Sequence, residues 1–275
     1  MNKTIIFPEN WDEITPDQYA WLLKYMAEEE HTASIETIRV LFTDYILGQR
    51  RPMTSHKRTN YFALVEELSK SLDWLFRVEN NLIMLNYDTT NNLIPKIGKL
   101  LGPLSHGSDL KFREYQEAVV AYNEFTETFE ESHLNRLVGI LYRPANKSIN
   151  KNDFDGNRRM PFNRYHMARY IEAGKGVPGY LKWGIYLWFA AFCKYLLSGG
   201  IFIIDGKEIS FTRIFKKGGE PVGTDIGMNA ILFSLADTGT FGKVSETEDT
   251  ELFRVLLKLL HDANMMDEIE RKNKK

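Results

Sequence analysis

Three glycines, Gly174, Gly176 and Gly179, have the spacing of the phosphate-binding loop found in dinucleotide-binding proteins. In those proteins the loop follows a strand and opens a helix, so that the helix N-terminus faces the pyrophosphate. Here the preceding residues, RYHMARYIEAG, have a helical pattern, and Pro178 removes one of the N–H groups that such a loop would present. We therefore interpret the stretch as a turn between two helices, with Gly174 as the cap of the first, and we expect no nucleotide cofactor.

Metal-binding and catalytic patterns are incomplete. Residues KNDFDGN are similar to part of a calcium-binding loop, but aligning Gly156 with its invariant glycine places Lys151 and Phe162 where oxygen donors are required. The six histidines lack zinc-binding spacing, and the apolar neighbours of Cys193 favour a thiol with a raised pKa. We therefore predict no metal, no cofactor, no catalytic residue and a protein that is not an enzyme. An active site that the fold assembles from distant residues is the alternative.

The charge balance argues against nucleic acid as the main partner. The chain has 35 basic and 37 acidic residues, so no overall field attracts nucleic acid or an anionic membrane. Its single cysteine excludes a disulfide within the chain, and the first residues lack the long apolar stretch of a signal peptide. We expect a reducing compartment or a virion.

The most apolar stretch, residues 180–197, is too short between its charges to cross a membrane. Only 11 residues separate Lys182 from Lys194, whereas a membrane-spanning helix needs about 20. We predict a buried central helix at this place and no membrane partner.

The most polar stretch, residues 143–164, is the candidate binding segment. It has six basic residues against Asp153 and Asp155. A long polar segment inside a domain is often functional, and a solvated loop without a partner is the alternative. Because regularly interleaved aromatic residues are lacking, we favour an acidic protein surface over nucleic acid as the partner. The candidate contact residues are Arg143, Lys147, Arg158 and Arg159.

Apolar residues recur at helical spacing over most of the chain. The pattern predicts helices over about 16–26, 33–47, 56–77, 163–173, 180–197, 224–237 and 245–270, and one or two helices over 109–141. Thr15 with Gln18 and Ser245 with Glu248 have the spacing of N-terminal capping boxes, and Asp109 is placed to cap a helix.

Two segments break this helical pattern. Ile201–Ile204 and Glu208–Phe215, joined by Asp205-Gly206, predict a β-hairpin. Residues 80–108, rich in Asn, Gly and Pro, predict a connection with one or two short strands.

The predicted fold class is mainly α, a multi-helix globular fold with a small β-hairpin and a short extended segment near the N-terminus. We divide the chain into an N-terminal helical region (1–79), a connecting segment (80–108) and a C-terminal helical region (109–275) that contains the hairpin 201–215. We expect these parts to form one compact unit.

Three segments of the chain share their pattern of aromatic residues, caps and turns with a known group of proteins. The segments are FPENWDEITPDQYAWLL near the start, LKFREYQEAVVAYNEFTETFEESHLNRLVGILYRPA in the middle and ILFSLADTGTFGKVSETEDTELFRVLLKLL near the end. Together they resemble proteins encoded among the tail genes of phages and prophages of gut bacteria. The resemblance covers about a third of the chain and assigns no catalytic residue.

Some members of this group occupy the gene position of tail assembly chaperones, beside the tape-measure gene. The resemblance therefore implies a non-enzymatic chaperone in the host cytoplasm that binds tape-measure or tube components. Such a chaperone would hold apolar helical segments of its partner, and Trp11, Trp21 and exposed aromatic residues of the 109–141 helix would be contacts. The alternative is a structural subunit of the virion tail or neck, which would form a symmetric homo-oligomer.

Overall fold

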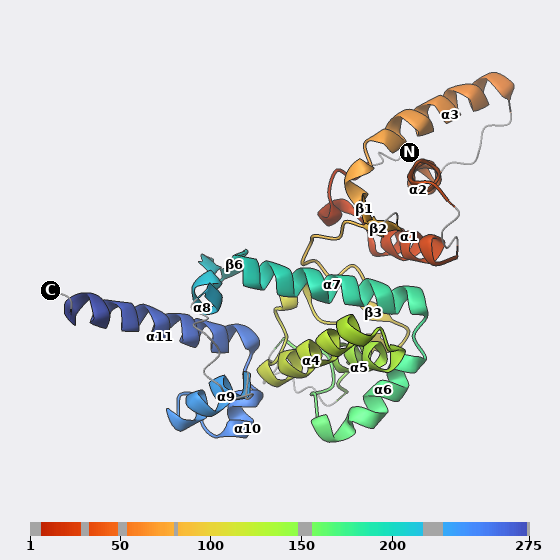
Figure 1. Cartoon of the computed structure of the whole chain (residues 1–275). Coiled ribbons are helices and arrows are strands. Elements are labelled where there is room, and N and C mark those ends of the chain that lie inside the picture. Colours follow the sequence, from red (N-terminus) through yellow and green to blue (C-terminus); the bar gives the residue numbers. More distant parts are fainter. Residues whose placement is uncertain are drawn as a thin grey trace.

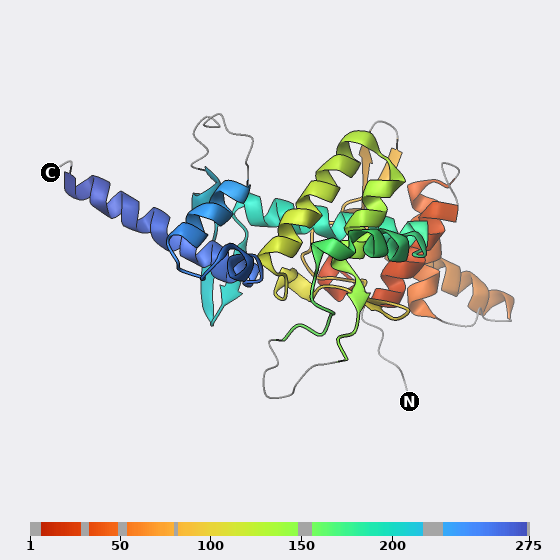
Figure 2. The same ribbon diagram turned by 90° about the horizontal axis from the view of Figure 1, so that it is seen from below.

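Helix α7, Gly179–Ser198, crosses the middle of the computed structural model (Figure 1). The structure describes residues 7–28, 33–48, 54–79, 82–147, 156–216 and 228–273. Within these ranges it is mainly helical with short antiparallel strand pairs, which confirms the predicted fold class. The N-terminal helices and the C-terminal helices lie at opposite ends of α7, so the molecule is elongated (Figure 2).

The composition of α7 explains its central position. Its side chains Ile185, Trp188 and Phe192 are at most 1% exposed, as expected for the predicted buried helix. Gly184 allows a close approach of the first helix, because a Cβ at this position would lie 2.4 Å from Leu23 Cδ1. Among the described helices, none combines the length and the apolar character needed to cross a bilayer.

The N-terminal region consists of α1 (Pro16–Glu28), α2 (Ile35–Leu47) and α3 (Ser55–Lys70). The predicted capping box at the start of α1 is present. Thr15 N donates to Gln18 Oε1 at 2.8 Å, and Gln18 N donates to Thr15 Oγ1 at 3.3 Å. The predicted start of α1 is therefore confirmed.

Helix α3 ends earlier than the predicted limit of residue 77. A 3-10 turn, η2 (Asp73–Leu75), follows it, and β1 (Phe76–Glu79) then pairs antiparallel with β2 (Leu82–Leu85). Leu75 is 0% exposed and Phe76 8% exposed, so both are buried by the turn away from the helix axis. Burial and strand pairing outweigh the helical spacing here.

The middle of the chain forms two helices, α4 (Phe112–Thr128) and α5 (Glu131–Leu141), rather than one. They are separate because Phe129, with a φ of 56°, ends α4 in the left-handed conformation. Asp109 does not cap α4 as predicted. The helix starts after Lys111, and Phe112 N donates to Thr250 O at 2.8 Å.

Helix α6 (Met167–Lys175) crosses α5 at two glycines. A Cβ on Gly139 would lie 2.1 Å from Tyr170 O, and a Cβ on Gly174 would lie 2.2 Å from Asn135 O. Gly174 is therefore an interior packing residue of α6 and not its cap, which corrects the sequence interpretation. The predicted turn between two helices is confirmed, with α6 ending at Gly176.

The connecting segment contains the short strands β3 (Lys96–Ile97) and β4 (Leu100–Leu101) and the 3-10 turn η3 (Ser105–Gly107). Strand β4 also pairs with β5 (Arg143–Pro144), which follows α5. With β2, the segment has three short strands where one or two were expected, and β4 attaches it to the body of the molecule.

The predicted hairpin is present in a shorter form. Strand β6 (Ile201–Ile204) pairs with β7 (Lys207–Ser210) across the turn Asp205-Gly206. The second strand ends at Ser210 instead of Phe215, because residues 212–216 form the helix α8 (Thr212–Lys216).

Three helices, α9 (Met228–Asp237), α10 (Val244–Glu248) and α11 (Leu252–Asn273), finish the described chain. The predicted capping box of Ser245 with Glu248 is absent: Lys243 N donates to Glu246 Oε2 at 2.7 Å, and Glu248 forms an ion pair with Arg113 instead. Helix α11 extends away from the body towards the C-terminus (Figure 1).

One cluster of buried apolar side chains connects these parts. It includes Trp11 from the N-terminal region, Leu93 from the connecting segment, and Phe192 and Leu256 from the C-terminal region. The three predicted regions therefore share a core.

Candidate functional site

A cleft of about 680 Å³ lies where segments distant in sequence meet. One wall consists of residues 10–12, where the turn η1 (Trp11–Glu13) begins, and of residues 88–90. Strand β6 and the first turns of α11 line another part of the cleft. The cleft has the size of ordinary ligand sites, about 300–1,000 Å³.

The polar wall of the cleft is held together by hydrogen bonds. Asp12 Oδ1 accepts from Thr89 Oγ1 at 2.7 Å and from Asn91 Nδ2 at 2.8 Å. Next to them, Thr90 Oγ1 and His106 Nδ1 are 2.6 Å apart, and His106 has a left-handed φ of 62°. These contacts join η1 to the connecting segment and order the side chains that face the cleft.

Carboxylates outnumber cations around the cleft. Its lining includes Asp12, Asp88, Asp205 and Glu251, against the single guanidinium of Arg254. Arg254 Nε lies 2.9 Å from Glu251 Oε2. The cleft therefore carries an excess of negative charge, which favours a cationic occupant.

Strand β6 and helix α11 contribute apolar side chains to the cleft. Ile201 and Ile203 on β6 are 55% and 77% exposed, although both are large aliphatic side chains. Phe253 and Leu257 of α11 are half-buried and also line the cleft. Apolar side chains and carboxylates therefore line this side of the cleft together, since Asp205 directly follows β6 and Glu251 directly precedes α11.

Of the predicted contact residues, Trp11 lies at the cleft but is buried. Only 2% of it is exposed, and its Nε1 donates to Asn86 O at 2.8 Å. Its ring meets those of Tyr19 and Trp74 edge to face. The expectation that Trp11 is an exposed partner contact is therefore wrong for this conformation, because its indole is a part of the core.

Trp21 is not among the residues that line the cleft, and it lies on the side of α1 that packs against α2. It is half-buried and stacks on Phe42 and Tyr45 of α2, with ring centroids 5.5 Å and 4.9 Å apart. This stacking gives Trp21 a role in α1–α2 packing. Of the aromatic residues on α4 and at its end, Phe125 is buried and Phe129 is 70% exposed.

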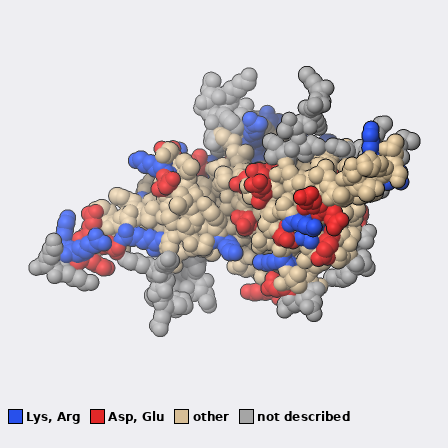
Figure 3. Space-filling model, turned by 90° about the horizontal axis from the view of Figure 1, so that it is seen from above, with Lys and Arg blue, Asp and Glu red and all other residues tan. Residues whose placement is uncertain are grey.

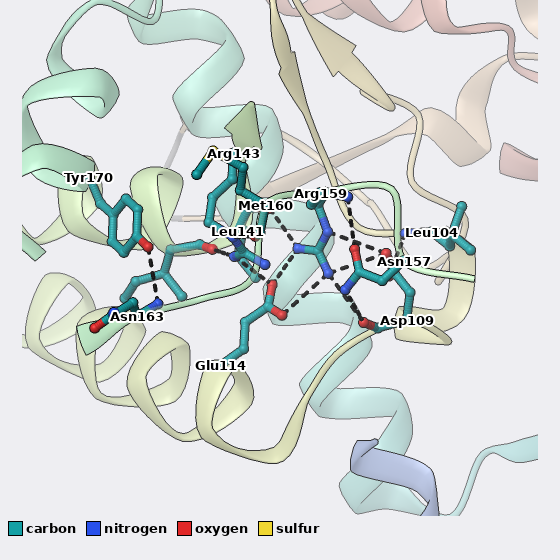
Figure 4. A network of polar contacts seen from close by, with 11 residues as sticks. Leu104, Asp109, Glu114, Leu141, Arg143, Asn157, Arg159, Met160, Asn163 and Tyr170 are labelled. Atoms are coloured by element: carbon teal, nitrogen blue, oxygen red, sulfur yellow. Dashed lines mark hydrogen bonds and ion pairs between the residues drawn. The ribbon is translucent and has the colours of Figure 1, made fainter. Parts of the chain in front are cut away.

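Two of the predicted basic contacts, Arg143 and Arg159, are buried in a network of ion pairs (Figure 4). Both guanidinium groups point at Glu114 of α4, which is 0% exposed. Arg143 Nη1 lies 3.0 Å from Glu114 Oε1, and Arg143 Nε donates to Met160 O at 2.7 Å. A partner cannot reach these groups, so the prediction that they are surface contacts is corrected.

Arg159 also pairs with Asp109. Arg159 Nε donates to Asp109 Oδ2 at 3.2 Å, and its Nη1 donates to Leu141 O at 2.8 Å. Burial raises the pKa of Asp109, and the nearby Arg159 only partly offsets this effect. The network thus attaches the 157–160 segment to α4, α5 and the connecting segment.

The remaining predicted contacts, Lys147 and Arg158, are exposed. The backbones beside them are paired, since Asn146 N donates to Arg158 O at 2.9 Å and Met160 N donates to Pro144 O at 2.8 Å. Residues 148–155 of the predicted basic segment lie outside the described residues. On the face shown in Figure 3, basic and acidic side chains lie side by side over the molecule.

A second, smaller cavity of about 300 Å³ lies beside the network of Figure 4. Arg143, Arg159 and Arg113 line it, together with Glu114 and Asp249. The guanidinium groups already pair with carboxylates, Arg113 with Glu248 and the other two with Glu114. We therefore interpret the groups around this cavity as ion pairs that connect elements of the fold.

The thiol of Cys193 is buried, as predicted, and burial raises its pKa to about 12. Within the described ranges, no group of three or more His, Cys, Asp and Glu side chains is placed to hold a metal ion.

Sequence reasoning missed Asp88, His106 and Ile203 as site residues. The Asp205-Gly206 turn correctly predicted the hairpin, but the run IFII gave no sign of which face would be solvent-exposed. Asp88 and His106 come from a segment without periodicity, whose position depends on contacts with η1 and α7.

The sequence matches no protein-family model, and the comparisons with curated proteins and with solved structures likewise found no match.

Proposed function

We propose that this protein is a non-enzymatic binding protein that holds a segment of another chain in the cleft between the residue 10–12 wall and β6. The observation that carries the proposal is the exposure of Ile201 and Ile203 along one wall of a cleft of about 680 Å³. Large aliphatic side chains exposed in a concave site are typical of protein-binding surfaces.

The resemblance to phage tail proteins supports a specific role for this binding. We propose that the protein is a tail assembly chaperone, and that its partner is the tape-measure protein or a tube component. The cleft suits this role because its apolar side chains can contact an apolar segment while its carboxylates select against acidic ones. Release of the segment would follow when tube polymerisation competes for it.

A co-purification experiment tests the proposal. The protein is expressed together with the tape-measure and tube proteins of the same tail gene cluster, and we expect one of them to co-purify. The variant Asp88→Lys reverses one exposed charge in the cleft, and we expect it to recover about tenfold less partner. Glu127→Lys, an exposed charge reversal on α4, is the matched control and should behave as the wild type.

Failure to recover either tail protein, with wild-type folding confirmed, would refute the chaperone proposal. Recovery that is equal for wild type and Asp88→Lys would place the contact outside the cleft. If the protein is instead a structural subunit of the tail or neck, it will be present in purified particles and will form a symmetric oligomer by light scattering.

The contact between His106 and Thr90 favours a second candidate function, an enzyme for acyl transfer. A hydroxyl at 2.6 Å from an imidazole nitrogen is the arrangement of a nucleophile and its base, and left-handed backbone at a non-glycine residue occurs at functional sites. This enzyme would hydrolyse activated esters, and His106→Ala would abolish the hydrolysis.

A further inference from the structure

Strand β6 borders the cleft, and none of the β7 residues does. Residues 201–205, which comprise β6 and the first turn residue, all line it. The hairpin is a two-stranded sheet, so β7 covers only one edge of β6. The other edge is where a further strand could pair.

The register of the hairpin shows which backbone groups point to that edge. Asp205 and Gly206 both have positive φ, 50° and 74°, as in the tight two-residue turn in which the flanking residues form a hydrogen-bonded pair. Ile204 and Lys207 are this pair. Because hydrogen-bonded and non-hydrogen-bonded pairs alternate, the N–H and C=O groups of Ile203 point away from β7.

Tyr195 confirms this orientation at the other end of the strand. Ile201 has the same orientation as Ile203, and the Tyr195 hydroxyl accepts from Ile201 N at 3.1 Å and donates to Ile201 O at 2.9 Å. The edge at Ile201 is thus covered by a side chain. At Ile203, no described group hydrogen-bonds to the N–H or the C=O.

The two strands of the hairpin also differ in charge. Strand β7 carries Lys207 and Glu208, whereas β6 consists of four apolar residues. Charged residues on an edge strand discourage pairing with another chain. Strand β6 lacks this protection on the side that faces the cleft.

We propose that the partner segment binds as a third strand, paired with β6 through the backbone of Ile203, and that it alternates basic with apolar residues. This inference rests on the proposed function and names the binding mode of the same cleft. The four carboxylates of the lining, against the single Arg254, complement basic side chains. The apolar residues of the segment contact Ile201 and Ile203, and the Tyr195 hydroxyl ends the ladder at Ile201.

The variant Ile203→Pro tests the pairing directly. Proline removes the N–H that points into the cleft and leaves the bonds between β6 and β7 in place, because Ile203 makes none of them. Glu208→Pro is the matched control, because Glu208 is the cross-strand partner of Ile203, also makes none of the β6–β7 bonds, and does not line the cleft. Circular dichroism verifies that both variants fold.

The probe is a ten-residue peptide of alternating Lys and Val. We expect it to bind the wild type and Glu208→Pro equally, and to bind Ile203→Pro at least about tenfold more weakly. The same peptide with N-methylated central amides, and a peptide of alternating Glu and Val, should both lose binding. In amide hydrogen exchange followed by NMR, the Ile203 N–H should become protected only when the Lys/Val peptide is bound.

Three results would overturn strand pairing, and the first two leave the proposed function standing. One is peptide binding that neither Ile203→Pro nor N-methylation weakens. Another is no binding of the Lys/Val peptide while a helical Lys/Leu peptide binds in a manner that depends on Asp88. The third is a dimer that Ile203→Pro dissociates, because the occupant of the edge would then be a second copy of this chain. Failure of tape-measure and tube co-purification with intact Lys/Val binding would refute only the chaperone role.

Discussion

Arg143 Nη1 lies 3.0 Å from Glu114 Oε1, and the two side chains are 1% and 0% exposed. Removing one member of a buried ion pair leaves an uncompensated charge, which typically costs about 3–5 kcal/mol. We therefore expect Glu114→Gln to lower the free energy of unfolding by an amount in that range, measured by urea denaturation. Glu117→Gln on the same helix is the control: Glu117 is 27% exposed and pairs with Arg136, so we expect a loss of about 1 kcal/mol or less. Equal losses for the two variants would contradict the structural role of the network.

The pH dependence of stability gives a second test of the same network. Burial alone would raise the pKa of Glu114, but Arg143 and Arg159 outweigh it and lower the pKa. A carboxyl whose pKa is lowered by folding adds stability above its unfolded pKa, about 4.3, and this contribution is lost as the pH falls through the folded pKa. Asp109 acts in the opposite sense: its pKa is raised, so its contribution is present at low pH and is lost as the pH rises through the folded pKa.

We expect the contribution of Glu114 to stability to appear as a difference in pH dependence between the wild type and Glu114→Gln. Urea titrations from neutral pH to below about 4 should show a smaller loss of unfolding free energy for Glu114→Gln than for the wild type. Parallel curves would show that Glu114 has the same pKa in the folded and unfolded states.

The crossing of α5 and α6 is expected to tolerate no side chain at Gly174. A Cβ there would lie 2.2 Å from Asn135 O, a backbone atom that cannot move without shifting α5. We expect Gly174→Ala to destabilise the protein by about 1–3 kcal/mol or more. Gly176→Ala is the control, because its Cβ would meet only Ala173 O at 3.6 Å and its φ of −72° suits alanine. Thermal denaturation of the two variants measures the difference, and similar melting temperatures would argue against close packing at Gly174.

The thiol of Cys193 should be unreactive in the folded protein. Burial raises its pKa to about 12, so at mildly alkaline pH almost no thiolate is present, and the cysteine is buried. We expect a disulfide reagent to label Cys193 only after denaturant unfolds the chain. Rapid labelling of the folded protein would show that this part of α7 opens.

The two capping boxes suggested by the sequence should differ in their effect on stability. Thr15→Ala removes an Oγ1 that accepts from Gln18 N at 3.3 Å and should cost about 1 kcal/mol. Ser245→Ala removes a side chain that caps no helix in the structure and should be nearly neutral. Urea denaturation compares the two, and a large loss for Ser245→Ala would indicate that the predicted second box does form.

Local sequence correctly predicted the features whose cause is local. The Thr15–Gln18 box, the Asp205-Gly206 turn and the buried helix α7 depend on neighbouring residues and on apolar spacing, and all three are present. The same reasoning overextended α3 and the second strand of the hairpin. There, the burial of Leu75 and Phe211, both 0% exposed, selects another conformation.

The basic segment shows why charge in the sequence did not locate a surface. Arg143 and Arg159 look like their exposed neighbours Lys147 and Arg158 in composition and spacing. Their burial follows from Glu114, which lies 29 and 45 positions away in the sequence, and no local pattern marks that glutamate as buried. A charged side chain is buried only when the fold supplies its partner.

Residue propensity and periodicity were sufficient to predict the helical fold class, the hairpin and the absence of a long uncharged stretch in α7. They could not predict which arginines are buried or which strand borders a cleft, because these depend on tertiary contacts. The cleft exists because residues 10–12, 88–90, 201–205 and the start of α11 are brought together by a shared core. Such contacts depend on packing between segments that are far apart in the sequence. No single stretch of sequence therefore predicts them.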